Sequence, residues 1–191
     1  MQVIVCNPVF WSQQILVTME LADALYEQYS KAGMKYIAGQ VISGAWPFQE
    51  LWAIINTGDR PLPQRAAWAM DHTLERQPEL MHTILDDAVG ALLQPQHDAV
   101  YRMLLKGFDR LPDIPEDHQG VLYDRAIRWI LDPKAGVAVR VFSISLAAKI
   151  AADIPELQEE VCLAIESQLE YGSAGFCNRG GKVLKRFRKR S

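Results

Sequence analysis

An internal sequence repeat is the feature that most constrains how this chain can fold. An arginine recurs at nearly equal steps, each time with an apolar residue three positions before it, at Arg65, Arg102, Arg140 and Arg179. A second marker, proline followed by glutamate, recurs with almost the same step at Pro78, Pro115 and Pro155. The shared period is roughly 40 residues, within the range of about 20 to 50 residues that is typical of stacked repeat units. Two markers that share one period therefore predict a repeat architecture.

The sequence within each unit predicts two α-helices. Small and large apolar residues follow the arginine, as in residues 65–70 and 140–148, and indicate the first helix. The proline then starts the second helix, because its missing N–H costs nothing in a first helical turn. Apolar alternation never lasts long, and Asn-Gly or Asp-Gly hairpin turns do not occur, so strands are not expected. Residues 20–30 and 48–56 predict further helices, for a total of eight or nine.

The repeat also predicts how these helices assemble. A single antiparallel helix pair cannot bury its apolar face, so the pairs are expected to stack side by side. The fold class predicted is therefore an all-α superhelix, or solenoid, of stacked antiparallel helix pairs. We expect residues 19–191 to form a single domain of this kind. Residues 1–18, apolar but broken by Asn7-Pro8, are expected to be a loosely ordered N-terminal extension.

The net charge of -3 is an average over two unlike segments. Residues 179–191 contain seven Lys and Arg and no acidic residue, whereas residues 1–178 carry 13 basic and 23 acidic residues. Nucleic-acid affinity depends largely on neutralising phosphates, so an acidic body disfavours a nucleic-acid partner. The basic run begins at Arg179, inside the last predicted repeat, and is interpreted as a cap for the end of the solenoid.

The cysteines and the hydropathy pattern limit the cellular setting. Cys6, Cys162 and Cys177 are odd in number and form no Cys-x-x-Cys or Cys/His cluster, so neither a disulfide framework nor a structural zinc site is predicted. No metal or cofactor is expected, and no apolar run reaches the length of a membrane helix. A cytoplasmic protein is the expectation.

Residues 131–148 resemble a known repeat family. Leu131-Asp132-Pro133 followed by Val137-Ala-Val-Arg140 is similar to the HEAT-repeat signature, in which an Asp-Pro turn leads to Val-x-x-Arg and a small, apolar helix. Residues 48–188 resemble a group of small bacterial HEAT-like proteins of unknown function. The resemblance implies a binding surface and not a particular chemistry.

Two enzymatic interpretations arise from this resemblance. Proteins of the group are sometimes labelled adenylosuccinate lyase, but the lyase loop motif Ser-Ser-x-Met-Pro-x-Lys-x-Asn is absent here, so that interpretation is rejected. HEAT-like alkylpurine DNA glycosylases work through aromatic residues and an aspartate on a basic surface. Trp68 with Asp71, and Trp129 with Asp132, offer such pairs, although the acidic body opposes this function.

The candidate binding residues are the four repeated arginines together with Trp68 and Trp129. Each arginine is expected either to pair with an acid or a carbonyl of the adjacent unit or to bind phosphates or carboxylates along a groove. Asp59, Asp98 and Asp132 precede three of them and are the expected acidic partners. The tryptophans are expected to pack between helices, or else to form an aromatic binding surface. The four histidines are interpreted as surface or capping residues.

The function that these observations favour is a non-enzymatic scaffold that binds a protein or peptide partner through a concave face. No catalytic residue is assigned. A nucleic-acid-binding protein related to the glycosylases, and a helical enzyme that its sequence does not reveal, are the alternatives. An acidic groove would favour a protein partner, a basic groove would favour nucleic acid, and a deep pocket with converging titratable groups would favour catalysis.

Overall fold

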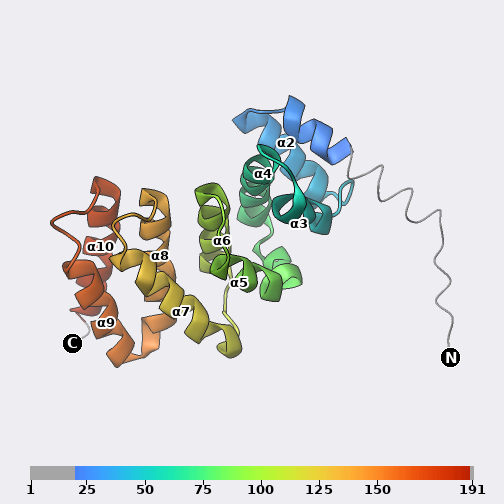
Figure 1. The fold of residues 1–191 in the computed structure, drawn as a ribbon. Coiled ribbons are helices and arrows are strands. Elements are labelled where there is room, and N and C mark those ends of the chain that lie inside the picture. Colours follow the sequence, from blue (N-terminus) through green and yellow to red (C-terminus); the bar gives the residue numbers. More distant parts are fainter. Residues whose placement is uncertain (1–19, 190–191) are drawn as a thin grey trace, which may run out of the picture. The chain divides into compact units, whose positions relative to one another are not determined.

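The computed structural model describes residues 20–189 and contains no strand in that range. Residues 20–27 form a first helical segment. The helices that follow are α2 (Lys31–Ile42), α3 (Phe48–Thr57), α4 (Leu62–Arg76), the 3-10 helix η1 (Pro78–Ile84), α5 (Leu85–Leu93), α6 (Asp98–Arg110), α7 (Glu116–Leu131), α8 (Val137–Ile150), the 3-10 helix η2 (Ala151–Asp153), α9 (Pro155–Glu166) and α10 (Ala174–Phe187) (Figure 1). The all-α fold predicted from the repeat is confirmed.

The helices form two compact units, with the boundary between Gln77 and Pro78. The expectation of a single domain over residues 19–191 stays a prediction, and the extension expected at residues 1–18 lies outside the described residues. Within residues 20–189, no helix is both long enough and apolar enough to cross a membrane.

The first unit is built around α4. This helix packs against α2 and α3, and its small residues Ala66, Ala67 and Ala69 are buried at the contacts. Small side chains let helices approach closely, which explains the alanine-rich stretch after Arg65. Ser30 is the N-cap of α2. Its hydroxyl oxygen accepts a hydrogen bond from the backbone N–H of Gly33 at 2.9 Å.

The second unit consists of two layers of helices. In the first layer α8 packs against α6 on one side and α10 on the other, and in the second layer α7 packs against α5 and α9 (Figure 1). Helix α8 also contacts α7, so it is surrounded by helices, and most of its residues are buried. This explains why its sequence is apolar almost all round. Phe108 and Phe176, at most 1% exposed, belong to the core of this unit.

The prolines mark the starts of helices, with one difference from the sequence-based prediction. Pro155 is the first residue of α9, and Pro115 is the residue immediately before α7. Pro78 instead begins η1, and α5 starts only at Leu85. Met81 and Ile84 are the buried residues of this segment, and their spacing of three matches the period of a 3-10 helix.

Candidate functional site

Two of the four repeated arginines hold the ends of other helices. The Arg65 guanidinium donates from Nη1 to the carbonyls of Leu25 and Tyr26, at 3.1 and 2.9 Å, at the end of helical segment 20–27. Arg140 donates from Nη2 to the carbonyl of Ile130 in the last turn of α7, at 2.9 Å, and to Gln168 Oε1 at 3.0 Å. Carbonyls in a last helical turn lack intrahelical donors, and cations there complement the helix dipole.

The other contacts of Arg65 and Arg140 also indicate a structural role. Arg140 is 7% exposed, and its guanidinium lies 4.6 Å from the centre of the Phe176 ring. Arg65 lies 4.3 Å from the ring centre of Tyr29. Their hydrogen-bond acceptors are main-chain and amide oxygens and not the expected aspartates. Asp132, for example, accepts from the backbone N–H of Lys134 at 2.8 Å.

The other two repeated arginines reach solvent. Arg102 on α6 is exposed, and its side chain has no hydrogen-bond or ion-pair partner among residues 20–189. Arg179 on α10 is half-buried and donates from Nη1 to the hydroxyl oxygen of Ser145 on α8. The four arginines therefore divide into two that cap helices and two with donors still available, and a binding role for them stays a prediction.

Three further cations that the repeat search missed also cap helices. Arg125 donates from Nε to the carbonyl of Leu92 at 3.1 Å, at the end of α5. Lys149 donates to the carbonyls of Phe108, Asp109 and Leu111 at the end of α6, and Arg186 donates to the carbonyl of Ala148 at the end of α8, at 2.7 Å. Burial lowers the pKa of Lys149, and the charges of Asp109 and Asp113 partly offset this effect.

A signal for two of these residues was present in the sequence. Arg110, Lys149 and Arg186 follow one another at steps that match the repeat period. The three positions thus form a second series of basic residues, near the ends of α6, α8 and α10.

The two candidate tryptophans contact aromatic residues within their own units. Trp129 is 7% exposed, lies edge-on to Tyr101 with 4.9 Å between ring centres, and has the Arg125 guanidinium 4.3 Å from its ring. Trp68 is half-buried and lies edge-on to Tyr29 at 5.9 Å. Trp129 thus packs between α7 and α6, and Trp68 packs between α4 and the turn at Tyr29; a binding role for either tryptophan stays a prediction.

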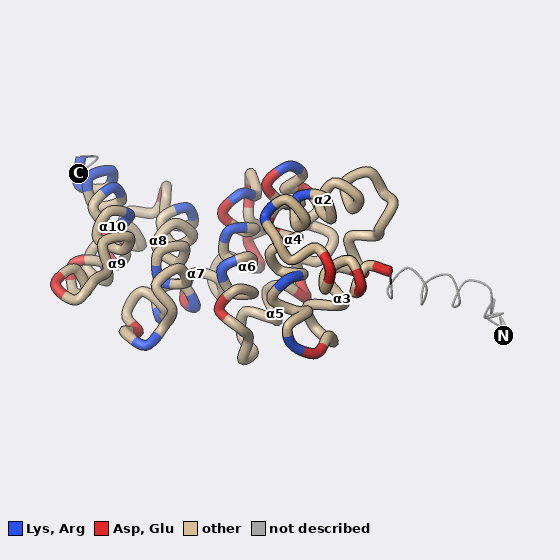
Figure 2. The backbone as a smooth tube through the Cα atoms, turned by 90° about the horizontal axis from the view of Figure 1, so that it is seen from above, with Lys and Arg blue, Asp and Glu red and all other residues tan. Residues whose placement is uncertain are grey.

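Charge in the second unit is divided between its two layers. Helices α6, α8 and α10 carry three, two and four Lys or Arg residues, against two acidic residues, both in α6. Helices α5, α7 and α9 carry two, three and four acidic residues, against two arginines, both in α7. Figure 2 shows the Lys and Arg positions gathered along α10. One layer thus has a formal charge of +7 and the other of -7.

The basic layer contains a groove between α8 and α10, which also reaches the end of α6. Its volume is about 670 Å³, and we call it the α8–α10 groove. It is lined by four cations, one acid and four small or apolar residues: Lys149, Arg179, Lys182, Arg186, Asp109, Ser145, Ala148, Ala152 and Val183. A groove lined in this way favours an anionic ligand.

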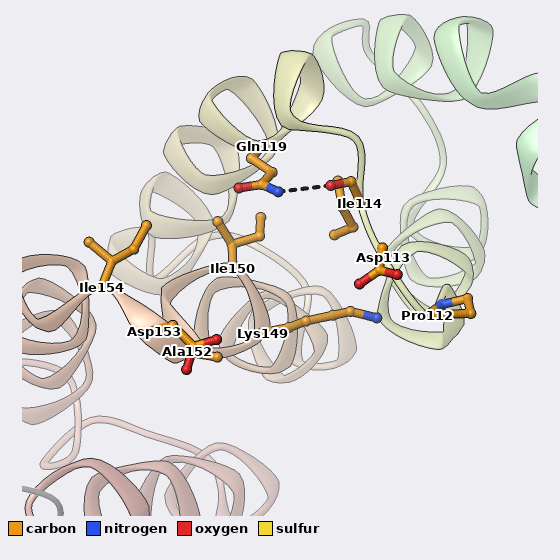
Figure 3. Close-up of a pocket in the computed structure, with 9 residues that line it drawn as sticks. All are labelled: Pro112, Asp113, Ile114, Gln119, Lys149, Ile150, Ala152, Asp153 and Ile154. Atoms are coloured by element: carbon orange, nitrogen blue, oxygen red, sulfur yellow. Dashed lines mark hydrogen bonds between the residues drawn. The ribbon is translucent and has the colours of Figure 1, made fainter.

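A second pocket, of about 470 Å³, shares Lys149 and Ala152 with the α8–α10 groove (Figure 3). Residues of the repeated Asp-Ile-Pro-Glu segments line it, namely Asp113 with Ile114 and Asp153 with Ile154. Gln119 closes part of it by donating to the carbonyl of Ile114 at 2.8 Å. The fold thus brings two short motifs, which lie one repeat apart in sequence, into one pocket.

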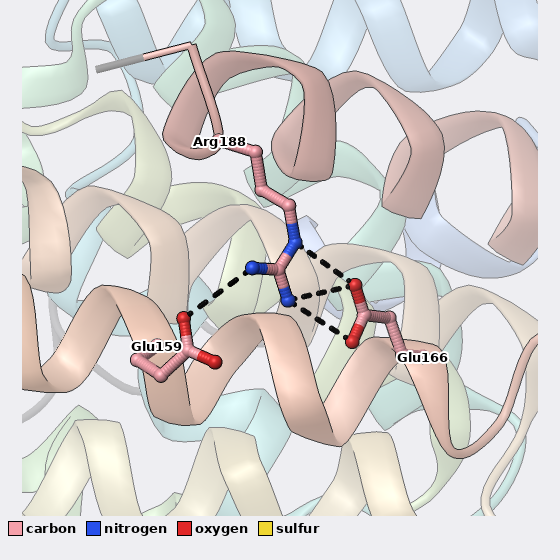
Figure 4. Close-up of polar contacts among 3 residues, drawn as sticks. All are labelled: Glu159, Glu166 and Arg188. Atoms are coloured by element: carbon pink, nitrogen blue, oxygen red, sulfur yellow. Dashed lines mark hydrogen bonds and ion pairs between the residues drawn. The ribbon is translucent and has the colours of Figure 1, made fainter. Parts of the chain in front are cut away.

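The basic end of α10 is tied to the acidic layer by one arginine. Arg188 donates from Nε and Nη2 to the carboxylate of Glu166 at 2.9 to 3.1 Å, and its Nη1 lies 3.6 Å from Glu159 Oε2 (Figure 4). The hydrogen bonds and the charge of Glu166, followed by the charge of Glu159, raise the pKa of Arg188. This contact fits the interpretation of the basic run as a cap for the last repeat, because it joins the end of α10 to α9.

The Trp-Asp pairs that could serve a DNA-repair centre lie away from the α8–α10 groove. The pair Trp68 and Asp71 lies on α4, and Trp129 and Asp132 lie at the end of α7, so neither pair lines the α8–α10 groove. In residues 20–189, no group of three or more His, Cys, Asp or Glu side chains is placed to hold a metal ion.

Two histidines make polar contacts at the starts of helices. The Nδ1 atom of His97 accepts from the backbone N–H of Ala99 at the start of α6. His118 Nε2 lies 2.8 Å from Asp86 Oδ1, and this contact joins the start of α7 to α5.

Comparison with known proteins agrees with this architecture. The HEAT repeat domain family matches residues 21–186, which include all four repeated arginines and every labelled helix up to the last turn of α10. Neither the curated proteins nor the solved structures contain a match. Because the family match covers most of the sequence and the helices stack in pairs as the repeat requires, the chain belongs to the HEAT repeat domain family.

Proposed function

We propose that this chain is a non-enzymatic HEAT repeat scaffold that binds a protein partner, and that the basic layer formed by α6, α8 and α10 is its binding face. The observation that carries the proposal is the division of charge, with +7 on this layer and -7 on the layer of α5, α7 and α9. Proteins associate through surfaces of complementary potential, and such surfaces steer the encounter. The concave face predicted from the sequence stays a prediction.

The fold does not need all of this charge. Arg140 and Lys149 cap helices, but Arg102, Lys182 and Lys185 are exposed and have no hydrogen-bond or ion-pair partner among residues 20–189. Exposed charges contribute about 0 to 1 kcal/mol each to stability. Stability therefore does not explain why these three cations lie together on one layer, whereas recognition of an acidic partner does.

A basic groove by itself favours nucleic acid, but two further features of this unit favour a protein partner. The acidic layer belongs to the same unit and repels an extended polyanion such as a DNA duplex. An acidic protein segment is shorter, so it can contact the basic layer without approaching the acidic one. The groove also lacks the aromatic side chains on which nucleic-acid bases usually stack.

Site-specific photo-crosslinking in the native cell tests the proposal. A benzophenone amino acid replaces Arg102 on α6 or Lys185 on α10, and the matched control replaces Leu163, a 57% exposed residue on the acidic helix α9. We expect protease-sensitive, nuclease-resistant adducts from the two positions on the basic layer and none from the control. Equal adducts at all three positions, adducts only at Leu163, or nuclease-sensitive adducts would overturn the proposal.

A further inference from the structure

The α8–α10 groove presents three cations on one face of one helix. Arg179, Lys182 and Arg186 occupy positions i, i+3 and i+7 of α10, and all three line the groove. Residues at this spacing share a helix face, and the rise of a helix places the first and last about 10 Å apart along the axis. The opposite wall, on α8, is formed by the small side chains of Ser145, Ala148 and Ala152, the last just beyond the end of that helix.

Donors on these cations remain available to a ligand. Arg179 uses Nη1 for Ser145 and Arg186 uses Nη2 for the carbonyl of Ala148, so each guanidinium keeps further N–H groups. Lys182 is exposed and has no partner among residues 20–189. The two arginines are thus already oriented by α8, which lowers the entropic cost of binding a ligand.

The other two charged residues that line the groove, Lys149 and Asp109, offer no donor to a ligand. Lys149 donates to three carbonyls at the end of α6, so it adds positive charge to the groove but no spare donor. Asp109 is the only acid among the lining residues and lies near Lys149, whose charge offsets it. The net character of the groove is therefore positive, and its binding donors come from α10.

Building on the proposed function, we propose that the α8–α10 groove binds an acidic peptide segment of the protein partner, whose carboxylates accept hydrogen bonds from Arg179, Lys182 and Arg186. Arginine guanidiniums match carboxylates in geometry and charge. In an extended segment, residues i and i+2 point to the same side about 7 Å apart. This distance is close to the axial separation of about 6 Å between Lys182 and Arg186. A groove of about 670 Å³ has room for such side chains.

Fluorescence anisotropy with the purified full chain tests this inference. The probes are a labelled decaglutamate peptide, a decaglutamine peptide of equal length and a labelled ten-nucleotide thymidine strand. The variant Lys182→Glu reverses a groove charge, and Lys134→Glu makes the same change in net charge at an exposed position between α7 and α8, which does not line the groove. Far-UV circular dichroism verifies that both variants fold.

We expect the decaglutamate to bind and the decaglutamine not to bind. Lys182→Glu weakens decaglutamate binding about tenfold, because one attraction becomes a repulsion, and Lys134→Glu weakens it less than about twofold. Equal weakening by the two variants would mean diffuse attraction and would overturn the inference. So would failure of the decaglutamate to bind, or tighter binding of the thymidine strand at equal salt.

The same variant separates this inference from the proposed function. If Lys182→Glu abolishes peptide binding and also reduces the protein adducts formed from Arg102 and Lys185 in cells, the groove is the peptide site of the scaffold. If the adducts persist unchanged with Lys182→Glu, the basic layer binds its partner elsewhere, and the groove inference alone is overturned. If wild-type protein gives no adducts from the basic layer, the proposed function fails, whatever the decaglutamate does.

Discussion

Replacing Arg140 with methionine should destabilise the protein far more than the same change at Arg102, although both arginines occupy the same position in the repeat. In Arg140→Met the carbonyl of Ile130 loses its donor, which costs about 1 to 2 kcal/mol for a buried acceptor. The contact with the Phe176 ring is also lost, at about 1 kcal/mol for a desolvated cation. Gln168 turns to water at little cost. The expected loss is therefore about 2 to 3 kcal/mol.

Urea unfolding followed by far-UV circular dichroism measures this difference. With a dependence of about 2 kcal/mol per molar urea, Arg140→Met lowers the midpoint by about 1 M. Arg102→Met stays within about 0.5 kcal/mol of the wild type, because an exposed side chain without a partner is removed. The methionine variants retain an unbranched aliphatic chain, so the comparison isolates the guanidinium.

Two results would refute the reasoning. If Arg140→Met shifts the midpoint no more than Arg102→Met, the guanidinium does not hold the end of α7. If both variants lose about 2 to 3 kcal/mol, the repeated arginines share one structural role, and Arg102 is not a free cation.

Three further outcomes follow from packing and protonation. Gly180→Ala places a methyl group 2.7 Å from a side chain of α9 and should lower the free energy of unfolding by about 1 to 3 kcal/mol. The matched variant Gly181→Ala meets nothing within 4 Å and should be neutral or stabilising in the same urea titration. Burial and the hydrogen bond from Tyr123 to the Glu160 carboxylate raise the Tyr123 pKa above its ordinary value of 10.0, so the folded state keeps a proton that the unfolded state releases. The stability advantage of wild type over Tyr123→Phe should therefore shrink as pH rises above about 10; a constant difference in unfolding free energy between about pH 8 and 11 would contradict this. Burial also raises the Cys162 thiol pKa, and that residue is 1% exposed, so a thiol reagent should label half-buried Cys177 before Cys162. Peptide mass spectrometry measures the two rates, and faster labelling of Cys162 would contradict the packing.

The fold was predictable because each repeat unit carries the same sequence markers, so several units support one prediction. The spacing of the arginines and of the Pro-Glu pairs predicted paired helices, and α7 and α9 start at the Pro-Glu pairs as predicted, whereas the pair at Pro78 starts η1. The sequence does not show that Pro78 starts a 3-10 turn, because the buried pair Met81 and Ile84 is compatible with either helix type until its neighbours are known.

The candidate site was harder to predict, for two physical reasons. Arg65 and Arg140 bind main-chain carbonyls, which every residue has, so the sequence left acids and carbonyls open as partners and could not identify the residues that accept. Along the sequence, charge divides between an acidic body and a basic end, whereas in space it is also divided between the two layers of the second unit. That division appears only once each helix is assigned to its layer, because basic and acidic helices alternate along the chain.

Hydrogen exchange of the chain, alone and with the purified partner that crosslinking identifies, tests whether the basic layer is the binding face. Binding should slow backbone exchange in peptides from α6, α8 and α10, with Arg179, Lys182 and Arg186 at the centre of the protected region. Peptides from α5, α7 and α9 should be unchanged. Protection confined to the acidic layer, or spread equally over both layers, would contradict the claim that the basic layer is the binding face.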